Sequence, residues 1–93
     1  MNEKLLEKKL REEVKKLGGL ALKFASASYT GMPDRIVLMK GGNVHFVELK
    51  STGRKQTDRQ LVVSKMLMKY GFEVTIIDSQ DGLNNFLNSL KCQ

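Results

Sequence analysis

The chain has 93 residues, of which 41% are hydrophobic and 28% are charged, and its net charge is +6. This length allows one domain with one core, expected to span residues 1–93, and the composition excludes a disordered or fibrous chain. No apolar run approaches the roughly 20 residues of a membrane-spanning helix, and the charged N-terminal segment lacks the apolar block of a signal peptide. We therefore expect a cytoplasmic protein with no membrane partner.

The excess of basic residues bears on the kind of partner. Sixteen Lys and Arg residues against ten Asp and Glu residues favour a polyanion, because cationic side chains neutralise phosphates and release counterions. Charge alone does not establish this, since small basic proteins without a nucleic-acid partner are common. The one cysteine, Cys92, excludes an internal disulfide and a cysteine-based metal site, and we expect it to be a free thiol.

The first part of the chain predicts a helix followed by a strand. Apolar residues recur at helical spacing from Glu3 to about Leu17, which gives one face of an amphipathic helix. Gly18 and Gly19 end this helix. The short apolar segment Leu20–Ala25 then predicts a strand, and the polar residues 26–31 predict a loop.

Residues 33–50 predict a hairpin that begins at an aspartate. Pro33 fixes its own backbone and favours extended geometry in the residue before it, which holds Asp34 at the start of the next strand. Two apolar segments, Arg35–Lys40 and Val44–Lys50, flank the tip Gly41-Gly42-Asn43. Glycines between two apolar segments are typical of a hairpin.

The rest of the chain predicts a helix, a strand and a closing helix. The segment Thr57–Tyr70 opens with a capping-box pattern, in which Thr57 is the N-cap and Gln60 follows three residues later, and Gly71 ends the helix. The alternating segment Phe72–Asp78 predicts a fourth strand, and spaced apolar residues near the C-terminus predict a short helix. The predicted order is α-β-β-β-α-β-α, an α/β fold.

The hairpin carries the residues with the clearest chemistry. Hydrolysis of a phosphodiester needs a cation to neutralise developing charge and an activated water. The carboxylates of Asp34 and Glu48 could hold Mg²⁺ or Mn²⁺, which need only one or two protein carboxylates. Because side chains alternate along a strand, Glu48 and Lys50 share a face, and the carbonyl of Leu49 is a possible third ligand. Lys50 would then orient the water or stabilise charge on the phosphate.

The shared metal site depends on the register of the hairpin. A two-residue turn at 41–42 would put Asp34 and Glu48 on opposite faces of the sheet, and the site would fail. A three-residue loop at 41–43 pairs Asp34 with Lys50 and puts it on the face of Glu48. We predict this three-residue loop, or a bulge at the start of the first hairpin strand with the same effect.

The order of these motifs resembles a known nuclease family. A helix with a Glu near its start is followed by the strand ALKF, the segment GMPDRIVL, the segment FVELK and a Gln that opens the next helix. This combination, from about Glu3 to Asp78, is similar to the PD-(D/E)xK nuclease superfamily and, more closely, to its VRR-NUC family. The resemblance implies a restriction-endonuclease-like αβββαβ core, with a mixed central sheet flanked by helices and a short C-terminal helix.

The resemblance also implies roles for individual residues. Asp34, Glu48 and Lys50 would form the catalytic centre, and the carbonyl of Leu49 would complete the shell of Mg²⁺ or Mn²⁺. Gln60 matches the glutamine of the family motif, although it has a structural explanation as the partner of Thr57 in the capping box. The acid of the first helix matches Glu7, and the nearby alternatives are Glu3, Glu12 and Glu13.

Several other side chains are weighed against simpler roles. His45 alternates away from Glu48, so we interpret it as a packed or surface histidine and not as a general base. A group of basic and aromatic residues near the proposed site are candidates for contact with the DNA backbone, although a solvated basic loop has the same composition. These candidates are Lys23, Tyr29, Arg35, Arg54, Lys55 and Arg59.

These features predict a metal-dependent endonuclease that hydrolyses phosphodiester bonds in DNA. The sequence contains no dedicated base-reading module, which favours selection by DNA structure over selection by sequence. Stand-alone VRR-NUC proteins resemble Holliday-junction resolvases, which implies branched DNA as substrate and a homodimer with two active sites. The alternatives are a non-catalytic nucleic-acid-binding accessory module and a restriction-like nuclease that cuts ordinary duplex. The sequence does not say whether a partner helicase is needed.

Overall fold

The computed structural model describes residues 1–91 and contains three helices and four strands. The predicted order α-β-β-β-α-β-α is confirmed, with bounds that differ from the predicted ones by at most three residues. Cys92, expected to be a free thiol, lies outside the described residues. The elements are α1 (Glu3–Lys16), β1 (Leu20–Lys23), β2 (Arg35–Met39), β3 (Asn43–Leu49), α2 (Asp58–Lys69), β4 (Glu73–Ile77) and α3 (Gln80–Lys91).

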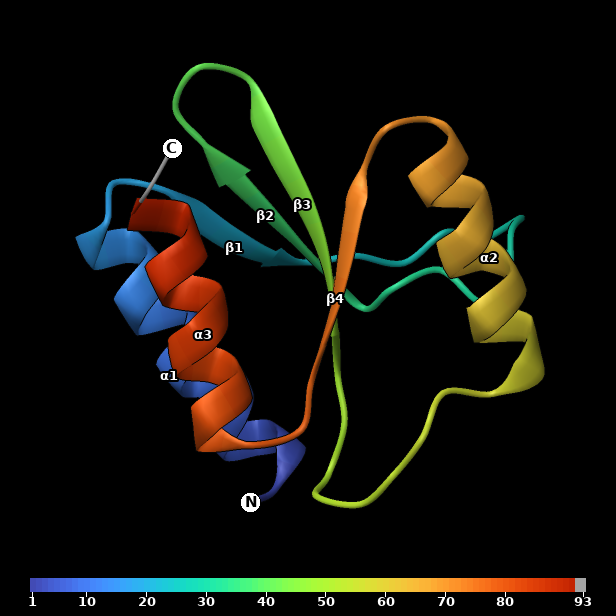
Figure 1. Ribbon diagram of the computed structural model, residues 1–93, viewed down its shortest axis with the longest axis horizontal. Coiled ribbons are helices and arrows are strands. Elements are labelled where there is room, and N and C mark those ends of the chain that lie inside the picture. Colours follow the sequence, from blue (N-terminus) through green and yellow to red (C-terminus); the bar gives the residue numbers. More distant parts are fainter. Residues whose placement is uncertain (92–93) are drawn as a thin grey trace.

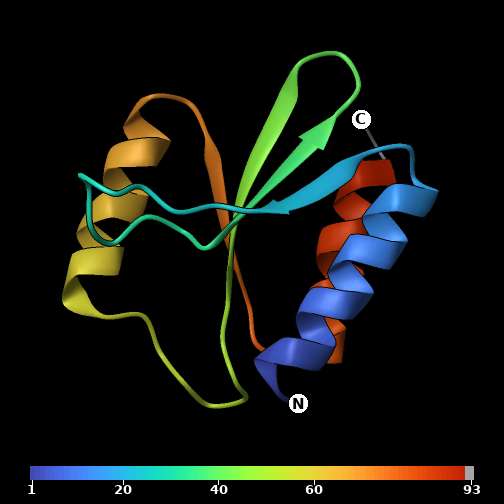
Figure 2. The same cartoon turned by 180° about the vertical axis from the view of Figure 1, so that it is seen from behind.

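The four strands form one mixed sheet in the order β1-β2-β3-β4. The pairs β1–β2 and β2–β3 are antiparallel, and β3–β4 is parallel. The parallel pair requires a crossover, and α2 provides it. Helices α1 and α3 lie side by side against one face of the sheet, and α2 lies on the other (Figures 1 and 2). The fold class predicted from the sequence is therefore confirmed. Within residues 1–91, no helix has the length and apolar character needed to cross a bilayer.

Strand β3 is the centre of the fold because it is buried on both faces. Val47 and Leu49 point to the layer of α1 and α3, where they pack in a core cluster with Leu6 of α1. Phe46 points to the opposite layer and packs with Val63 of α2. Side chains of even-numbered β3 residues therefore share a layer with α2, and this alternation continues toward the end of the strand.

The hairpin register has the predicted parity but not the predicted position. Met39 pairs with Asn43, so the loop is the three residues Lys40-Gly41-Gly42, shifted by one residue from the predicted 41–43. Gly41 and Gly42 have φ of +85° and +80°, a conformation that glycine adopts without a Cβ penalty. The left-handed pair therefore occupies the last two positions of the loop, and Asn43 joins β3.

This register changes the partner predicted for the aspartate. Arg35 pairs with Val47, so continuing the register by one residue brings Asp34 level with Glu48. The prediction that Asp34 lies opposite Lys50 was wrong, because the residue level with Asp34 is Glu48, two residues earlier in the chain. A shift of two residues preserves the alternation, so Asp34 and Glu48 still lie on one face.

The loop between β1 and β2 packs against α2 at a glycine. Gly31 has a φ of +88°, and a Cβ placed there would meet the Cγ of Arg59 at 2.8 Å and a methyl of Val63 at 3.1 Å. We expect Gly31→Ala to lower the free energy of unfolding by about 1–3 kcal/mol, because the backbone strain and the clash add. Urea unfolding would measure this loss.

Gly53→Ala is the matched control for Gly31→Ala. Gly53 has a similar φ of +83°, but nothing lies within 4 Å of the position of its Cβ. We expect this variant to lose only the backbone term, about 1 kcal/mol. Equal losses in the two variants would contradict close packing of the loop on α2.

Candidate active site

Asp34 reaches across the sheet to the end of β3. Its backbone carbonyl accepts a hydrogen bond from the N–H of Phe24 at 2.9 Å, which ties the residue to the end of β1. Its side-chain Oδ1 accepts a hydrogen bond from the backbone N–H of Leu49 at 3.1 Å. Pro33, which precedes it, is fully buried and fixes the backbone on the N-terminal side. The aspartate is therefore held at the point where β3 leaves the sheet.

Glu48 and Lys50 lie beside this aspartate. The carboxylate of Glu48 is 5% exposed and lies 3.5 Å from the Nζ of Lys50, which is 15% exposed. The backbone of Asp34 also acts on the Glu48 carboxylate and lowers its pKa in part. The structure thus brings together the two carboxylates and the lysine predicted from the sequence. Glu48 and Lys50 are largely buried, whereas the side chain of Asp34 is 34% exposed.

The negative charges of Asp34 and Glu48 repel each other. Burial is the largest cause that raises the pKa of Asp34, and the Leu49 N–H and the Arg35 guanidinium oppose it in part. Burial also raises the pKa of Glu48, and the negative charge of Asp34 raises it further, against the pull of Lys50. Two acids held together against their charge cost stability, so a purely structural role does not explain them.

This arrangement predicts how stability depends on pH without a divalent metal. Since the pKa of each acid is raised in the folded state, the folded state binds protons more readily than the unfolded state, and the protonated acids favour folding. We expect this contribution to be fully present below the ordinary values of 3.8 and 4.5, and to be lost as pH rises through the raised values.

Urea unfolding in EDTA across this pH range would measure the effect. The control is the double variant Asp34→Asn with Glu48→Gln, whose stability should fall less than that of the wild type over the same rise in pH. Parallel curves for the two proteins would contradict the electrostatic conflict between the acids.

The donor set of this centre fits a hard divalent cation. Asp34 and Glu48 supply carboxylate oxygens. Leu49 directs its N–H to Asp34, and in an extended strand the carbonyl of the same residue points the same way. Among residues 1–91, no group of three or more His, Cys, Asp or Glu residues could hold a metal. Two carboxylates, a carbonyl and waters are a set that suits Mg²⁺ or Mn²⁺.

Two glutamates of α1, Glu7 and Glu3, are candidates for the acid of the first helix. Glu7 is bound to Arg11, whose Nη1 lies 2.8 Å from each of its carboxylate oxygens. The acid of α1 whose charge acts on Asp34 is Glu3, one of the alternatives to Glu7. A helical repeat puts Glu3 and Glu7 on neighbouring positions of one face, so the sequence pattern by itself does not separate them.

Gln60 forms the predicted capping box. Its backbone N–H donates to the Oγ1 of Thr57 at 3.1 Å, and its side-chain Oε1 accepts from the N–H of Thr57 at 2.9 Å. The simple structural role of this glutamine is therefore present. Any role in catalysis has to be separated from it.

Thr57→Ala and Gln60→Ala separate the two roles, because both break the same capping box. We expect each to cost about 1 kcal/mol of stability. If Gln60 also serves the active site, Gln60→Ala lowers the cleavage rate by about 10-fold beyond the effect of Thr57→Ala. Single-turnover cleavage with DNA and Mg²⁺ measures this, and equal rates would leave Gln60 with the cap alone.

His45 lies away from this centre, as the alternation predicts. It is 4% exposed, its ring lies edge-on to Phe86 of α3 at 5.9 Å, and its Nδ1 is 3.3 Å from the carboxylate of Glu73. These contacts are on the face of α1 and α3, opposite Glu48. The interpretation as a packed histidine is confirmed.

The candidates for contact with DNA differ in exposure. Five of them are exposed, namely Lys23, Tyr29, Arg54, Lys55 and Arg59. Tyr29 is 40% exposed, with its hydroxyl 3.0 Å from the sulfur of Met66 and the guanidinium of Arg59 over its ring at 5.1 Å. Arg35 differs from all of these, because its side chain is 14% exposed and is turned toward Asp34.

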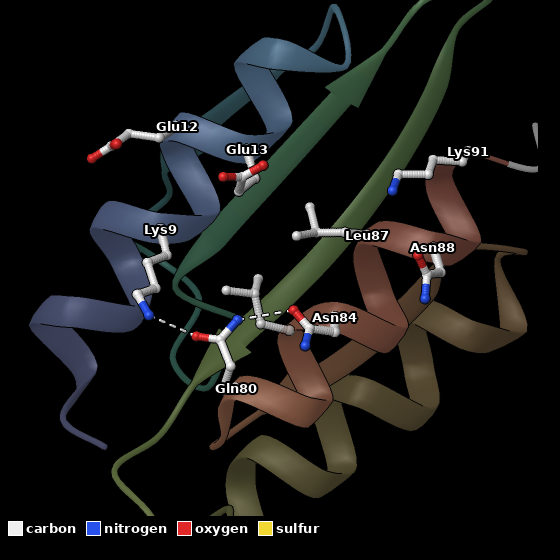
Figure 3. Close-up of a pocket in the computed structure, with 9 residues that line it drawn as sticks. Lys9, Glu12, Glu13, Gln80, Asn84, Leu87, Asn88 and Lys91 are labelled. Atoms are coloured by element: carbon white, nitrogen blue, oxygen red, sulfur yellow. Dashed lines mark hydrogen bonds between the residues drawn. The ribbon is translucent and has the colours of Figure 1, made fainter.

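The groove between α1 and α3 lies on the other face of the sheet (Figure 3). Three of its polar side chains are hydrogen-bonded in a row. The Nζ of Lys9 donates to the Oε1 of Gln80 at 2.8 Å, and the Nε2 of Gln80 donates to the Oδ1 of Asn84 at 2.9 Å. None of the residues that line it belongs to the centre of Asp34 and Glu48, so this groove is separate from the candidate active site.

Comparisons with known proteins identify the family. No family model matches the chain. The chain is 43% identical over 81 residues to the protein named "Putative nuclease p44" of Acyrthosiphon pisum secondary endosymbiont phage 1. The matched residues cover 87% of each chain. The structure of the present chain is similar to a solved structure described as a VRR_NUC domain. The TM-score is 0.86 and the identity is 28%, and the match covers 92% of this chain and 94% of the other. This chain therefore belongs to the VRR-NUC family of nucleases.

Proposed function

We propose that this protein is a divalent-metal-dependent endonuclease of the PD-(D/E)xK type that hydrolyses phosphodiester bonds in branched DNA. The observation that carries the proposal is the pair of carboxylates, Asp34 and Glu48, held together on one face of the sheet beside Lys50. A module that only bound DNA would gain nothing from two acids at the surface that meets a polyanion. A hydrolase needs them, because a cation turns the acids into a binding site for phosphate.

Each residue of the centre has a role in this proposal. Asp34, Glu48 and the carbonyl of Leu49 hold Mg²⁺ or Mn²⁺. A cation held there would supply charge neutralisation at the scissile phosphate and would lower the pKa of a bound water. Lys50, whose ammonium lies 3.5 Å from Glu48, orients that water or donates to a phosphate oxygen. Gln60 and an acid of α1, Glu7 or Glu3, support the centre from the flanking helices.

Contact with DNA is assigned to exposed cations around the centre. Arg54 and Lys55 lie in the loop that follows Lys50, and Arg59 lies in the first turn of α2. Their exposure suits contacts with phosphates, which position the duplex without reading its sequence. Lys23 and Tyr29 extend the same set toward β1. The net charge of +6 adds a general attraction for the polyanion.

The substrate and the assembly are inferred from the size of the chain together with the resemblance of stand-alone VRR-NUC proteins to Holliday-junction resolvases. A chain of 93 residues offers one centre and covers little DNA, whereas a junction must be cut on two strands. A symmetric homodimer places two centres on a symmetric branched substrate. We therefore assign four-way junctions as the preferred DNA and a dimer as the active form.

A cleavage panel tests this function. Flaps, splayed arms, four-way junctions and linear duplex are incubated with the wild type and with Lys50→Ala in Mg²⁺ or Mn²⁺. The proposal expects metal-dependent cuts, fastest on junctions, that Lys50→Ala abolishes. Equal activity in both proteins, or none under any metal, would leave a binding module instead. Fast cleavage of linear duplex would indicate a restriction-like nuclease.

Mixed dimers test the assembly. Wild type is combined with an excess of tagged Lys50→Ala, and light scattering reports the mass in solution. A dimer with one working centre should nick the junction on one strand, whereas the wild-type dimer makes paired incisions. Paired incisions by a protein that is monomeric at the working concentration would exclude the dimer.

A further inference from the structure

Arg35 is the one candidate DNA contact that the structure turns inward. Its Nη1 donates to the backbone carbonyl of Asp34 at 2.8 Å and lies 3.4 Å from the Oδ2 of the same residue. The side chain is 14% exposed, so little of the guanidinium can meet a phosphate. A side chain that reached DNA would instead extend into solvent, as the exposed Arg54 and Lys55 can.

The contacts of Arg35 complete the fixation of the aspartate. The Oδ1 of Asp34 is held by the Leu49 N–H at 3.1 Å, and its Oδ2 faces the guanidinium at 3.4 Å. Contacts at both carboxylate oxygens fix the plane of the group, whereas one contact leaves it free to rotate. Each oxygen keeps a further lone pair for a cation. The orientation of Asp34 is thus set before any ligand arrives.

Burial of the Arg35 guanidinium lowers stability, which also indicates a role other than stabilising the fold. The Nε of Arg35 is buried and has no hydrogen-bond partner among the described residues. An unpaired buried donor destabilises the fold, and an exposed arginine would avoid that loss. A residue chosen only for stability would not be placed so. The two polar contacts of the Arg35 guanidinium are both to Asp34, a proposed metal ligand.

We propose that Arg35 is a positioning residue, which holds the carboxylate of Asp34 in the orientation that binds the divalent cation, and that it does not contact DNA. The inference rests on the proposed metal site and assigns a role within it. It concerns a ligand-supporting residue, since Arg35 touches neither the phosphate nor the attacking water. Such outer partners typically contribute about 10- to 100-fold to metal affinity or activity.

The test measures metal binding and DNA binding separately. Mn²⁺ affinity is measured by calorimetry without DNA, and junction affinity is measured in EDTA, for wild type, Arg35→Gln and Arg54→Gln. We expect Arg35→Gln to weaken Mn²⁺ binding by about 10- to 100-fold and to leave junction affinity in EDTA unchanged. The matched control Arg54→Gln, in an exposed loop, should weaken junction binding and leave Mn²⁺ affinity unchanged.

Two further measurements separate positioning from a structural role. Since Arg35 would act through metal occupancy, saturating Mn²⁺ should restore most of the cleavage rate of Arg35→Gln. Arg35→Lys keeps a cationic donor and should recover part of the Mn²⁺ affinity, and it serves as the test variant if Arg35→Gln does not fold. A merely structural arginine would change the unfolding midpoint and leave the Mn²⁺ affinity of the folded protein as it is.

The possible outcomes are distinct. Unchanged Mn²⁺ affinity in a folded Arg35 variant, or a loss of junction affinity in EDTA equal to that of Arg54→Gln, would overturn the inference. A wild type that binds no Mn²⁺ and cuts no DNA would overturn the proposed function, and the inference with it. A wild type that binds and cuts leaves the Arg35 variants to decide the inference alone.

Discussion

Replacing Asp34 with Asn is expected to lower metal-dependent cleavage by more than about 100-fold. Mutation of residues that only support a metal ligand already lowers metal affinity or activity by about 10- to 100-fold. The amide oxygen of Asn can still accept the hydrogen bond from the Leu49 N–H, so the link between the start of β2 and the end of β3 should persist. What the variant loses is the negative charge that the cation needs. Single-turnover cleavage of a four-way junction in Mg²⁺ measures this loss.

Asp81→Asn is the matched control for this variant. Asp81 is an exposed acid in the first turn of α3, and Asp81→Asn removes the same charge at the surface. It should cleave at the wild-type rate. If Asp34→Asn cleaved as fast as Asp81→Asn while both were folded, Asp34 would not be a ligand, and the centre would need another acid.

Glu48→Gln is expected to change stability and activity in opposite directions. Glu48 is 5% exposed, and burial and the charge of Asp34 both raise its pKa, so its ionised form is held at a cost. In EDTA near neutral pH, the neutral amide should raise the free energy of unfolding, because it removes a charge that burial and Asp34 together disfavour. Cleavage in Mg²⁺ should be lost.

The metal should reverse the order of stability. A ligand that binds only the folded state stabilises it by about 2.7 kcal/mol at 100 times its dissociation constant. Wild type should gain this stabilisation from saturating Mg²⁺, and Glu48→Gln should gain little. Urea unfolding with EDTA or Mg²⁺ gives both comparisons. A variant less stable than wild type in both conditions would indicate that Glu48 supports the fold, through Lys50, more than it supports a metal.

Local patterns in the sequence predicted most of the fold. The capping box at Thr57 and Gln60 and the apolar spacing of α1 are interactions between residues three or four apart, and they formed as predicted. The shared face of Glu48 and Lys50 follows from alternation within one strand. The family resemblance placed these elements in one mixed sheet, which the structure confirms.

Other features depended on contacts between distant segments. The hairpin loop has the predicted three residues but begins at Lys40, and two left-handed glycines occupy its last two positions. The electrostatic contact between Glu3 and Asp34 required the docking of α1 on the sheet. No local pattern carries either result, since loop position and helix docking are set by the packing of both sides of the sheet.

The sequence by itself predicted which residues carry the chemistry, and the tertiary structure decided how they meet. Asp34, Glu48 and Lys50 could be named from turn chemistry and alternation, which act over a few residues. The hydrogen bond from Leu49 to Asp34 and the inward turn of Arg35 could not. Both depend on the strand register and on burial at the edge of the core, which exist only once the whole sheet has formed.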